Sequence, residues 1–508
     1  MVYIALNRKS SVSLTRQMYQ SLKNEILEGK LIGGTRLPSS RELSTELHVA
    51  RNVVVECYEQ LIAEGYAYSR NGSGTYVSAG ASWTTVNTGN SGMIRREGQV
   101  RREGQVQRNE QVLREEQSRQ EERGLHAVRK KENTEKSAST EAQIQTRVTS
   151  FRTGIPDLSQ IPVKKWAQTY HKVALDCTPE QLDYQEPMGN LSLRICLAEY
   201  LNRVRGMAVS PYNILITNGA AQAFSLLCEL VSEEEYVLVE NPLSCGLKET
   251  LQWNHVKMRP VRMDESGMKT YELPHEELQP LRLVFTTPGH QFPTGVILPV
   301  GRRMELIQYA RKNRCYLVED DYDSEFRFDG DPVETMQSLS PDQVIYVGTF
   351  SKTLMPSLRI GYMVLPDELC ATMCRAKYIA DIHSSNIEQL TLASLLKSGT
   401  YELHIRKQKK QYRKKRNELI RCLKQTFGSR VRITGAATGL HLVASFEDAD
   451  FNSELMERIH RAGIEIAPVK KHLLADEDRY KNALVFGYGN TKIDEIQDAI
   501  TRLFSIIY

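Results

Sequence analysis

The sequence predicts an α/β protein with two folded parts joined by a polar segment. Three observations support this prediction. Residues 12–79 combine helical periodicity with a hairpin signal, an Arg-, Glu- and Gln-rich stretch follows, and short apolar runs then alternate with helical patterns. With 508 residues the chain is too long for one compact core, so several domains are expected.

Composition narrows the class of protein. Apolar content of 41% and charged content of 25% are ordinary globular values, and a net charge of +4 neither requires nor excludes nucleic acid. No apolar run reaches the length of a signal peptide or a membrane span. The nine cysteines are scattered, and the close pair Cys370 and Cys374 lacks neighbouring ligands. We therefore expect reduced thiols, mostly in the core, no metal site, no membrane and a cytoplasmic location.

The N-terminal domain is predicted at residues 12–79. Apolar residues at helical spacing predict helices over 14–26, from Ser39 to Glu46, and over 49–61. Aromatic and β-branched residues on both sides of the Asn-Gly-Ser-Gly turn at 71–74 predict a β-hairpin. Three helices followed by a hairpin are the layout of a winged helix-turn-helix domain.

Residues 80–148 differ sharply in composition from the segments on both sides. RREGQV at 95–100 is repeated at 101–106, and large apolar residues are few. Such a segment cannot offset its ordering entropy by burial. We expect a polar, partly repetitive linker.

Residues 149–508 predict a large α/β domain with a smaller C-terminal lobe that begins near a helix at 400–427. Buried strands are predicted at 214–217, 236–240, 281–286, 315–319 and 344–347. Helical patterns between several of them favour a parallel sheet covered on both faces.

Polar residues of the N-terminal domain form a candidate surface for double-stranded DNA. They open the second and third helices or flank the hairpin turn, where backbone N–H groups and guanidinium groups reach phosphates and base edges. The candidate contacts are Ser39, Ser40, Arg41, Arg51, Asn52, Arg70, Gly74 and Thr75. Each residue alone has an ordinary explanation as a helix cap or a solvated charge. Taken together, their order resembles the pattern of the GntR type of bacterial regulator, which runs through GTRLPSSRELSTELHVARNVVVECYEQLIAEGYAYSRNGSGTYV. Ala50, where Ser is usual, removes one phosphate hydrogen bond.

Lys352 is the central candidate of the C-terminal part. It follows a buried strand within Gly348-Thr349-Phe350-Ser351-Lys352, where a charged amine is costly. A lysine of lowered pKa suits imine formation with an aldehyde cofactor, whereas a lone lysine after a strand is normally a surface charge. Asp320 and Tyr322 end another strand, where they can hold a pyridinium nitrogen and hydrogen-bond a ring oxygen.

A phosphate-binding end is predicted from two further stretches. Gly219, Ala220 and Ala221 join a strand to a helix, so backbone N–H groups can cradle an anion. Arg359 can pair with a dianionic phosphate, and the hydroxyl groups of Thr349 and Ser351 can add hydrogen bonds.

In this order, the motifs of residues 151–508 resemble the fold type I aminotransferases. With the N-terminal domain, the resemblance narrows to the MocR subfamily of GntR regulators, carried by EDDYDSEFRF and GTFSKTLMPSLRIGYMVLP. It implies pyridoxal 5'-phosphate as cofactor, with Lys352 as Schiff-base lysine, Asp320 on the pyridine nitrogen, Tyr322 on the 3-oxygen and Arg359 on the phosphate. It also implies a head-to-tail homodimer, in which Tyr184 of YQEPMGNLSLR reaches the cofactor site of the partner subunit.

The sequence departs from the family pattern around the expected effector. Ser244 stands where many relatives carry a tyrosine near the cofactor, and Gly246 where a GABA-sensing relative has an arginine. Lys481 stands where an arginine usually grips a carboxylate, with Arg479 close by. A lysine lacks the planar fork of arginine, so an amino acid as effector is in doubt.

Two functions stay open at this stage. The first is a regulator of vitamin B6, amino-acid or amine metabolism genes, whose binding to operator DNA responds to pyridoxal phosphate or to its adduct with an amine. The second is an active aminotransferase with an N-terminal interaction domain, because the lysine and its helpers are all present. A scaffold without a ligand fits poorly with Lys352, Asp320, Tyr322 and Arg359 together.

Overall fold

The computed structural model describes residues 4, 6–8, 13–63, 66–70, 74–78, 148–274, 280–329, 334–475 and 478–508. The predicted linker lies outside these residues apart from Val148, and so does the hairpin turn at 71–73. Within the described ranges, no helix is long and apolar enough to cross a membrane.

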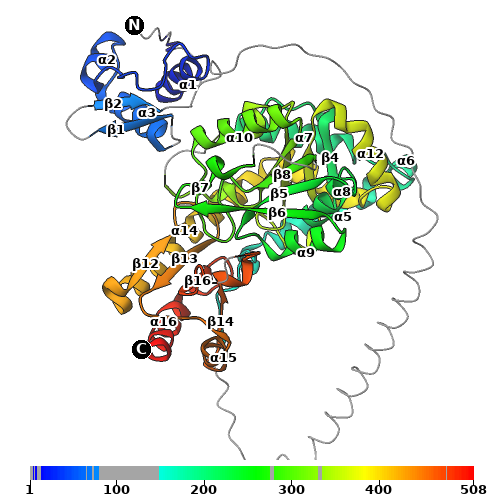
Figure 1. Ribbon diagram of the computed structural model, residues 1–508. Coiled ribbons are helices and arrows are strands. Elements are labelled where there is room, and N and C mark those ends of the chain that lie inside the picture. The colour runs from blue at the N-terminus through cyan, green and yellow to red at the C-terminus, as the bar shows by residue number, and fades with distance from the viewer. Residues whose placement is uncertain are drawn as a thin grey trace, which may run out of the picture. The chain divides into compact units, whose positions relative to one another are not determined.

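Three helices and a hairpin form the N-terminal domain (Figure 1): α1 (Leu14–Leu27), α2 (Ser40–Glu46), α3 (Arg51–Ala63), β1 (Ala67–Arg70) and β2 (Gly74–Val77). α1 buries Met18, Leu22 and Ile26 completely, so its periodic residues are its core face. α2 begins with a capping box, in which Ser39 Oγ accepts from the backbone N–H of Glu42 and the Glu42 carboxylate accepts from that of Ser39. The predicted order of elements is confirmed.

An eight-stranded sheet forms the centre of the large domain, in the order β4-β11-β10-β9-β8-β5-β6-β7. Its strands are β4 (Ile214–Thr217), β5 (Tyr236–Asn241), β6 (Lys257–Asp264), β7 (Gly267–Met268), β8 (Leu281–Thr286), β9 (Tyr316–Asp321), β10 (Val344–Thr349) and β11 (Gly361–Val364). All five predicted strands are present. The sheet is mainly parallel rather than wholly so, because β11 runs antiparallel to β10 and β4, and β7 antiparallel to β6.

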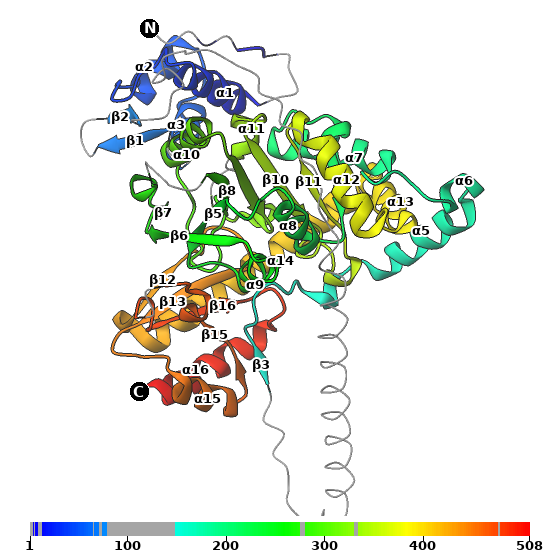
Figure 2. The ribbon, with the colours of Figure 1, turned by 45° about the vertical axis from the view of Figure 1, so that its right-hand side comes forward.

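Helices cover both faces of this sheet (Figure 2). Alternate residues of the buried strands belong to the two different cores beneath them. Val237 and Val318 belong to the core under α8 (Ala220–Cys228), α9 (Cys245–Trp253) and α12 (Asp367–Asp381). Leu238 and Leu317 pack on the other face, with α10 (Val300–Asn313) and α11 (Met336–Leu339). The remaining helices of the large domain are α5 (Val163–Asp176), α6 (Pro179–Leu182), α7 (Leu191–Arg205) and α13 (Asn386–Lys397).

The smaller lobe begins with the long helix α14 (Thr400–Phe427), as predicted. Its antiparallel sheet has the order β12-β13-β16-β15, and its core includes Phe446, Phe486 and Leu503. The elements are β12 (Val431–Thr434), β13 (His441–Phe446), α15 (Ser453–Arg461), β14 (Ile464–Glu465), β15 (Ala467–Pro468), β16 (Ala483–Gly487) and α16 (Ile496–Ile507). The short strand β3 (Thr149–Ser150), directly after the predicted linker, pairs with β14.

Candidate cofactor site

Most of the predicted cofactor residues line one cavity of about 420 Å³ at the carboxyl ends of β9 and β10. Strand ends of open α/β sheets are where ligands bind, because the following loops diverge there. The predicted residues in its lining are Ala220, Ala221, Asp320, Tyr322, Thr349, Ser351, Lys352 and Arg359. Gly219 is the N-cap of α8 beside them.

Lys352 reaches into this cavity from the segment after β10. Its Nζ donates a hydrogen bond of 2.7 Å to the carbonyl of Gly154. Gly154 has a φ of +76°, and a Cβ there would lie 3.0 Å from the Lys352 Nζ. Burial lowers the pKa of Lys352, although Asp323 and Asp320 oppose this shift. The amine is therefore held in place and biased toward its neutral, nucleophilic form.

Asp320 lies near the end of β9 and faces the same cavity. Burial raises its pKa to about 7, and the neighbouring Asp321 and Asp323 carboxylates add to the shift. A cation placed beside Asp320 would relieve this cost of ionisation. A protonated ring nitrogen is such a cation.

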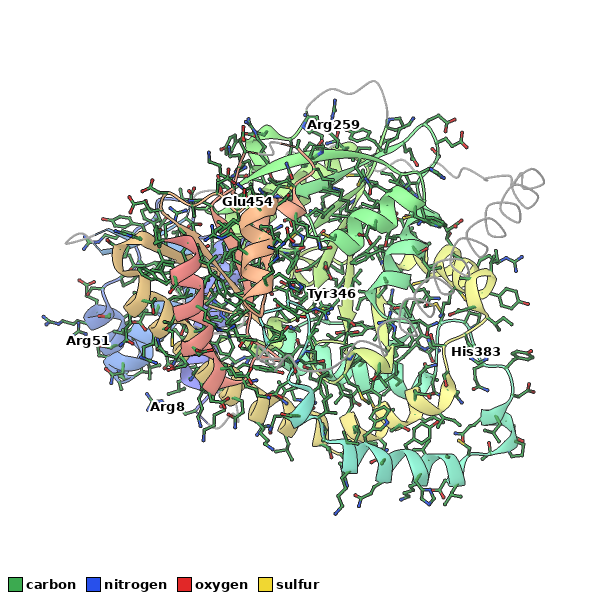
Figure 3. All side chains as sticks on the ribbon, turned by 90° about the horizontal axis from the view of Figure 1, so that it is seen from below. Arg8, Arg51, Arg259, Tyr346, His383 and Glu454 are labelled. Carbon is green, nitrogen blue, oxygen red and sulfur yellow. The ribbon has the colours of Figure 1, made fainter. Side chains whose placement is uncertain are left out.

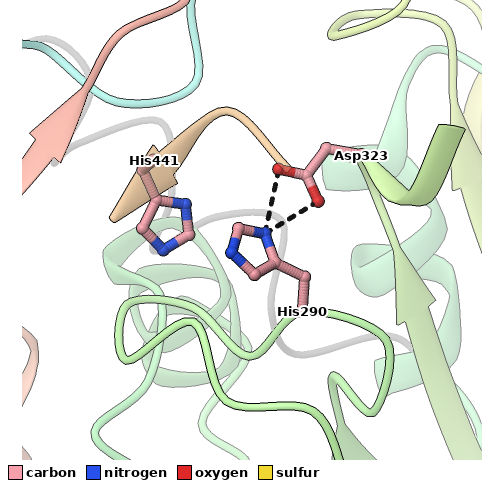
Figure 4. Close-up of side chains that lie close together, drawn as sticks. All are labelled: His290, Asp323 and His441. Carbon is pink, nitrogen blue, oxygen red and sulfur yellow. Dashed lines mark hydrogen bonds and ion pairs between the residues drawn. The ribbon is translucent and has the colours of Figure 1, made fainter. Parts of the chain in front are cut away.

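Tyr322 is oriented by its neighbours in the cavity wall. Its hydroxyl donates to the carbonyl of His290 over 2.9 Å, and the Nδ1 of His290 lies 3.0 Å from an Asp323 carboxylate oxygen. Figure 4 shows the His290 ring between Asp323 and His441. This network fixes the phenol at the edge of the cavity.

The buried trio His290, Asp323 and His441 brings its donor atoms within 4.8 Å of one another, an arrangement that geometry alone would allow to hold a metal ion. Each group also has a protein partner. His441 Nε2 lies 3.0 Å from the Pro293 carbonyl, and Asp323 accepts from the backbone N–H of Leu440 over 2.9 Å. These contacts join the two lobes across the cavity.

The phosphate-binding end combines a helix N-terminus with Arg359. Gly219 has a φ of +81°, and no side chain caps the first turn of α8. The Arg359 guanidinium donates to the carbonyl of Asn218 over 2.9 Å, and the hydroxyl of Thr349 donates to that of Ser351 over 3.0 Å. The N–H groups at the start of α8, a guanidinium and two hydroxyls are the groups that would cradle a phosphate.

A buried network supports this cradle from behind. Lys377, fully buried in α12, donates to Gln222 (2.8 Å), Asp381 (2.7 Å) and Ser384 (3.0 Å). The Gln222 side-chain oxygen also accepts from the backbone N–H of Asn218 over 2.8 Å, and Asp381 accepts from the Asn218 amide over 2.6 Å. The Asn218 backbone, which holds Arg359, is thereby fixed to α12.

Two predicted residues lie away from the cavity. Tyr184 is 77% exposed, and its ring lies 6.1 Å from that of His383. Lys481 is exposed at the surface of the smaller lobe. Its neighbour Arg479 donates to the Met263 carbonyl instead of facing the cavity.

Sequence reasoning missed cavity residues that come from distant segments. Cys245 Sγ lies 3.3 Å from His472 Nδ1, and both line the cavity together with Gly154 and His441. All nine cysteines are free, as expected, and Cys57, Cys228, Cys315 and Cys422 are buried. The half-buried Cys196, Cys370 and Cys374 pack against core clusters, so most of the cysteines fill the core, as expected. No local spacing connects Cys245 with His472, so the sequence carried no signal for this pair.

The candidate DNA-binding residues lie at the starts of α2 and α3 and beside the turn of the hairpin. Arg51 and Asn52 open α3 and are exposed, and Arg51 Nε donates to Ser40 Oγ at the start of α2 over 3.2 Å. Figure 3 shows Arg51 projecting away from the ribbon. Arg41 is exposed in the first turn of α2, Ser39 caps that helix, Arg70 ends β1, and Gly74 and Thr75 open β2.

Comparisons with known proteins agree with both parts of the chain. The family model for "Aminotransferase class I and II" matches residues 146–474, and that for "Bacterial regulatory proteins, gntR family" matches residues 14–77. The probable rhizopine catabolism regulatory protein MocR of Rhizobium meliloti is 29% identical over 507 residues, covering 99% of this chain and 95% of that protein. The pyridoxine biosynthesis transcriptional regulator PdxR of Corynebacterium glutamicum is 28% identical over 509 residues, covering 98% of each.

Solved structures give the same fold for the C-terminal part. An archaeal alanine:glyoxylate aminotransferase superposes with a TM-score of 0.66 at 27% identity, over 75% of this chain and 95% of its own. The kynurenine aminotransferase of Pyrococcus horikoshii has a TM-score of 0.65 at 25% identity, over 75% and 94%. The chain therefore belongs to the aminotransferase class I and II family, whose fold binds pyridoxal 5'-phosphate, and with its GntR-type DNA-binding domain it has the composition of the MocR-type transcription regulators.

Proposed function

We propose that this regulator binds operator DNA in a manner that responds to pyridoxal 5'-phosphate, or to an adduct of the cofactor with an amine. The observation that carries the proposal is the single cavity shared by Lys352, Asp320 and Arg359. We propose target genes of vitamin B6, amino-acid or amine metabolism; PdxR is named for pyridoxine biosynthesis and MocR for rhizopine catabolism. Such control requires that the bound ligand favour one arrangement of the protein over another.

The residues of the cavity fit the cofactor at each of its functional groups. Lys352 would hold the aldehyde carbon, Asp320 the ring nitrogen, Tyr322 the ring oxygen, and Arg359 with the start of α8 the phosphate. When bound, the cofactor supplies an electrophilic carbon conjugated to an electron-accepting ring. The lowered pKa of Lys352 and the raised pKa of Asp320 suit these partners.

A head-to-tail homodimer is part of the proposal. Tyr184 is exposed and lies outside its own cavity, which supports a role in the site of a second copy. A two-fold dimer would also present two GntR-type domains to a palindromic operator. Operator binding implies a cytoplasmic site of action. The proposed limits of the domains are 12–79 for the DNA-binding domain, 80–148 for the linker and 149–508 for the cofactor-binding domain.

The Lys352→Ala variant tests this function. We expect loss of the visible absorption of the bound cofactor, because no amine remains to bond its aldehyde carbon. DNA from the upstream region of its own gene should still bind, but fluorescence anisotropy should no longer change when pyridoxal phosphate is added. A wild-type chain that binds no cofactor, or a variant with an unaltered cofactor response, would refute the proposal.

An active aminotransferase is the second candidate function. The presence of Lys352, Asp320, Tyr322 and Arg359 in one cavity favours it, and a residual half-reaction is compatible with these groups. The positions of Lys481 and Arg479 outside the cavity lining speak against efficient use of amino acids. Sustained keto-acid formation from an amino acid and a keto-acid acceptor would establish the enzyme.

A further inference from the structure

The part of the cavity wall that the cofactor groups leave free carries no positive charge. It includes the start of α9, with Ser244, Cys245 and Gly246, together with Phe292, Asp323 and the two histidines His441 and His472. Among the described residues that line the cavity, Lys352 and Arg359 are the cations. Both are engaged by the cofactor in the proposed function.

Neither histidine supplies a positive charge to this part of the wall. Burial lowers the pKa of His472 to about 4 and that of His441 well below its usual value. His441 Nε2 donates to the Pro293 carbonyl over 3.0 Å, so this nitrogen carries a proton, and the lowered pKa leaves the other ring nitrogen unprotonated. Both rings are therefore uncharged near neutral pH.

The charge already present disfavours a further anion. In the proposed function Asp320 pairs with the ring nitrogen and Arg359 with the phosphate, so these groups leave no positive charge over, and the buried Asp323 carboxyl group also lines the cavity. The first turn of α9 also lines the wall, but a helix terminus amounts to about half a positive charge. A carboxylate there would lack a full counter-charge, which is costly in a buried site.

The same wall offers good contacts to an uncharged group. The Phe292 ring meets His441 edge to face at 5.1 Å and His472 at 5.0 Å, so three rings surround this part of the cavity. The Cys245 thiol lies 3.3 Å from the neutral His472 Nδ1. Apolar or aromatic groups fit such a surface.

From these observations we infer that the ligand sharing the cavity with the cofactor is a primary amine without a carboxylate, bearing an apolar or aromatic group. This inference rests on the proposed function. The amine nitrogen would take the place of Lys352 Nζ on the cofactor carbon: one carbon–nitrogen double bond would form and one would break, and the two hydrogens of the neutral amine would pass to Nζ, which would leave as the free lysine amine. No oxidant or reductant is required.

Matched ligand pairs test the inference. The full-length protein loaded with pyridoxal phosphate is titrated with 2-phenylethylamine and with phenylalanine, which differ by the carboxylate, and then with isobutylamine and valine. The change in visible absorption gives the affinity, and the thermal midpoint gives an independent readout. We expect each amine to bind at least about tenfold more tightly than its amino acid, because burying an uncompensated carboxylate is unfavourable.

The Gly246→Arg variant supplies a cation in the same wall. A Cβ at Gly246 meets no atom within 4 Å, so the position accepts a side chain. We expect the preference for amines to shrink or reverse in this variant. The exposed His460→Arg on α15 adds a charge away from the cavity and should leave the preference unchanged.

The outcomes separate the two claims. A wild-type protein that shows no cofactor absorption refutes the proposed function itself. A protein that binds the cofactor but prefers amino acids, binds both members of a pair equally, or responds to neither refutes the neutral-amine inference alone. If Gly246→Arg fails to fold, His472→Arg tests the same wall from the smaller lobe.

Discussion

Two glycines show how closely the site is built at the residue scale. Gly154 leaves room for the Lys352 amine, and Gly219 leaves room for the Arg359 guanidinium. A Cβ at Gly219 would lie 2.8 Å from Arg359 Nη2, and its φ of +81° is strained for other residues. The absence of a side chain at Gly219 thus lets a cation approach the start of α8.

We expect Gly219→Ala to weaken pyridoxal phosphate binding by about tenfold or more. The new methyl group displaces Arg359, and the backbone conformation costs about 1–2 kcal/mol. Spectroscopic titration of the purified protein measures the effect. Gly246→Ala is the matched control, since its Cβ meets nothing within 4 Å; equal affinities in the two variants would contradict the prediction.

A second residue, Glu240, makes the stability of the folded protein depend on pH. Its side chain is buried and accepts from the Thr286 hydroxyl over 2.7 Å, and burial raises its pKa to about 7. Because the pKa of Glu240 is higher in the folded than in the unfolded state, its protonated carboxyl group stabilises the fold. This stabilisation is fully present below the ordinary carboxyl pKa and is lost as the pH rises through about 7.

Glu240→Gln should therefore flatten the pH dependence of stability. Between about pH 5 and about pH 8, wild type should lose up to about 3 kcal/mol relative to the variant, since each pKa unit corresponds to about 1.4 kcal/mol. Denaturant unfolding at both pH values measures this difference. Parallel pH profiles of the two proteins would show that the carboxyl does not titrate as described.

At the scale of elements, prediction from the sequence worked where a buried strand reads as a short apolar run. β4 and β8 have the predicted limits, and the positions of Lys352 and Asp320 after or near strand ends predicted their meeting at one sheet edge. β6 was missed because its Lys257–Asp264 segment is partly exposed and carries charges and a proline. Cys245, His441 and His472 were missed because only tertiary packing brings them to the cavity.

The helix α12 has a function that its local sequence conceals. Its Lys377 reads as an ordinary helical cation, yet it is fully buried and bonds to Gln222, whose side chain holds the Asn218 backbone. In the proposed function Lys377 is thus a positioning residue for the phosphate-binding end. It is not among the residues that line the cavity.

We expect Lys377→Met to weaken binding of pyridoxal phosphate about tenfold while leaving the weaker binding of pyridoxal unchanged. Pyridoxal lacks the phosphate, so comparison of the two ligands separates a displaced phosphate cradle from general loss of the fold. The exposed Lys397→Met on α13 is the control. Equal losses for both ligands would mean that Lys377 only stabilises the domain.

At the scale of the whole molecule, the proposed dimer explains why Tyr184 is exposed. If Tyr184 completes the cavity of a second copy, its loss should harm the partner's site and spare its own. Subunits that carry complementary defects can distinguish this arrangement from a role within one chain.

Mixed dimers of Tyr184→Ala and Lys352→Ala subunits should regain one functional cofactor site in two. The subunit with Lys352 intact then receives a normal tyrosine from the other copy. Cofactor absorption after co-refolding, compared with each variant alone, measures the recovery. No recovery in verified mixed dimers would assign Tyr184 to its own chain or to no site.

The pairing of β3 with β14 fixes the point at which the chain enters the cofactor-binding domain after the predicted linker. Thr149 is buried and donates its backbone N–H to Gly463, and Phe151 packs against Phe486 at 5.2 Å. The predicted linker is therefore followed by a strand of the smaller lobe, and the same lobe contributes Leu440 and His441 to the cavity. Any displacement of that lobe when the cavity fills would also move β3, the first described strand after the predicted linker, so the proposed response to the cofactor would begin at this strand.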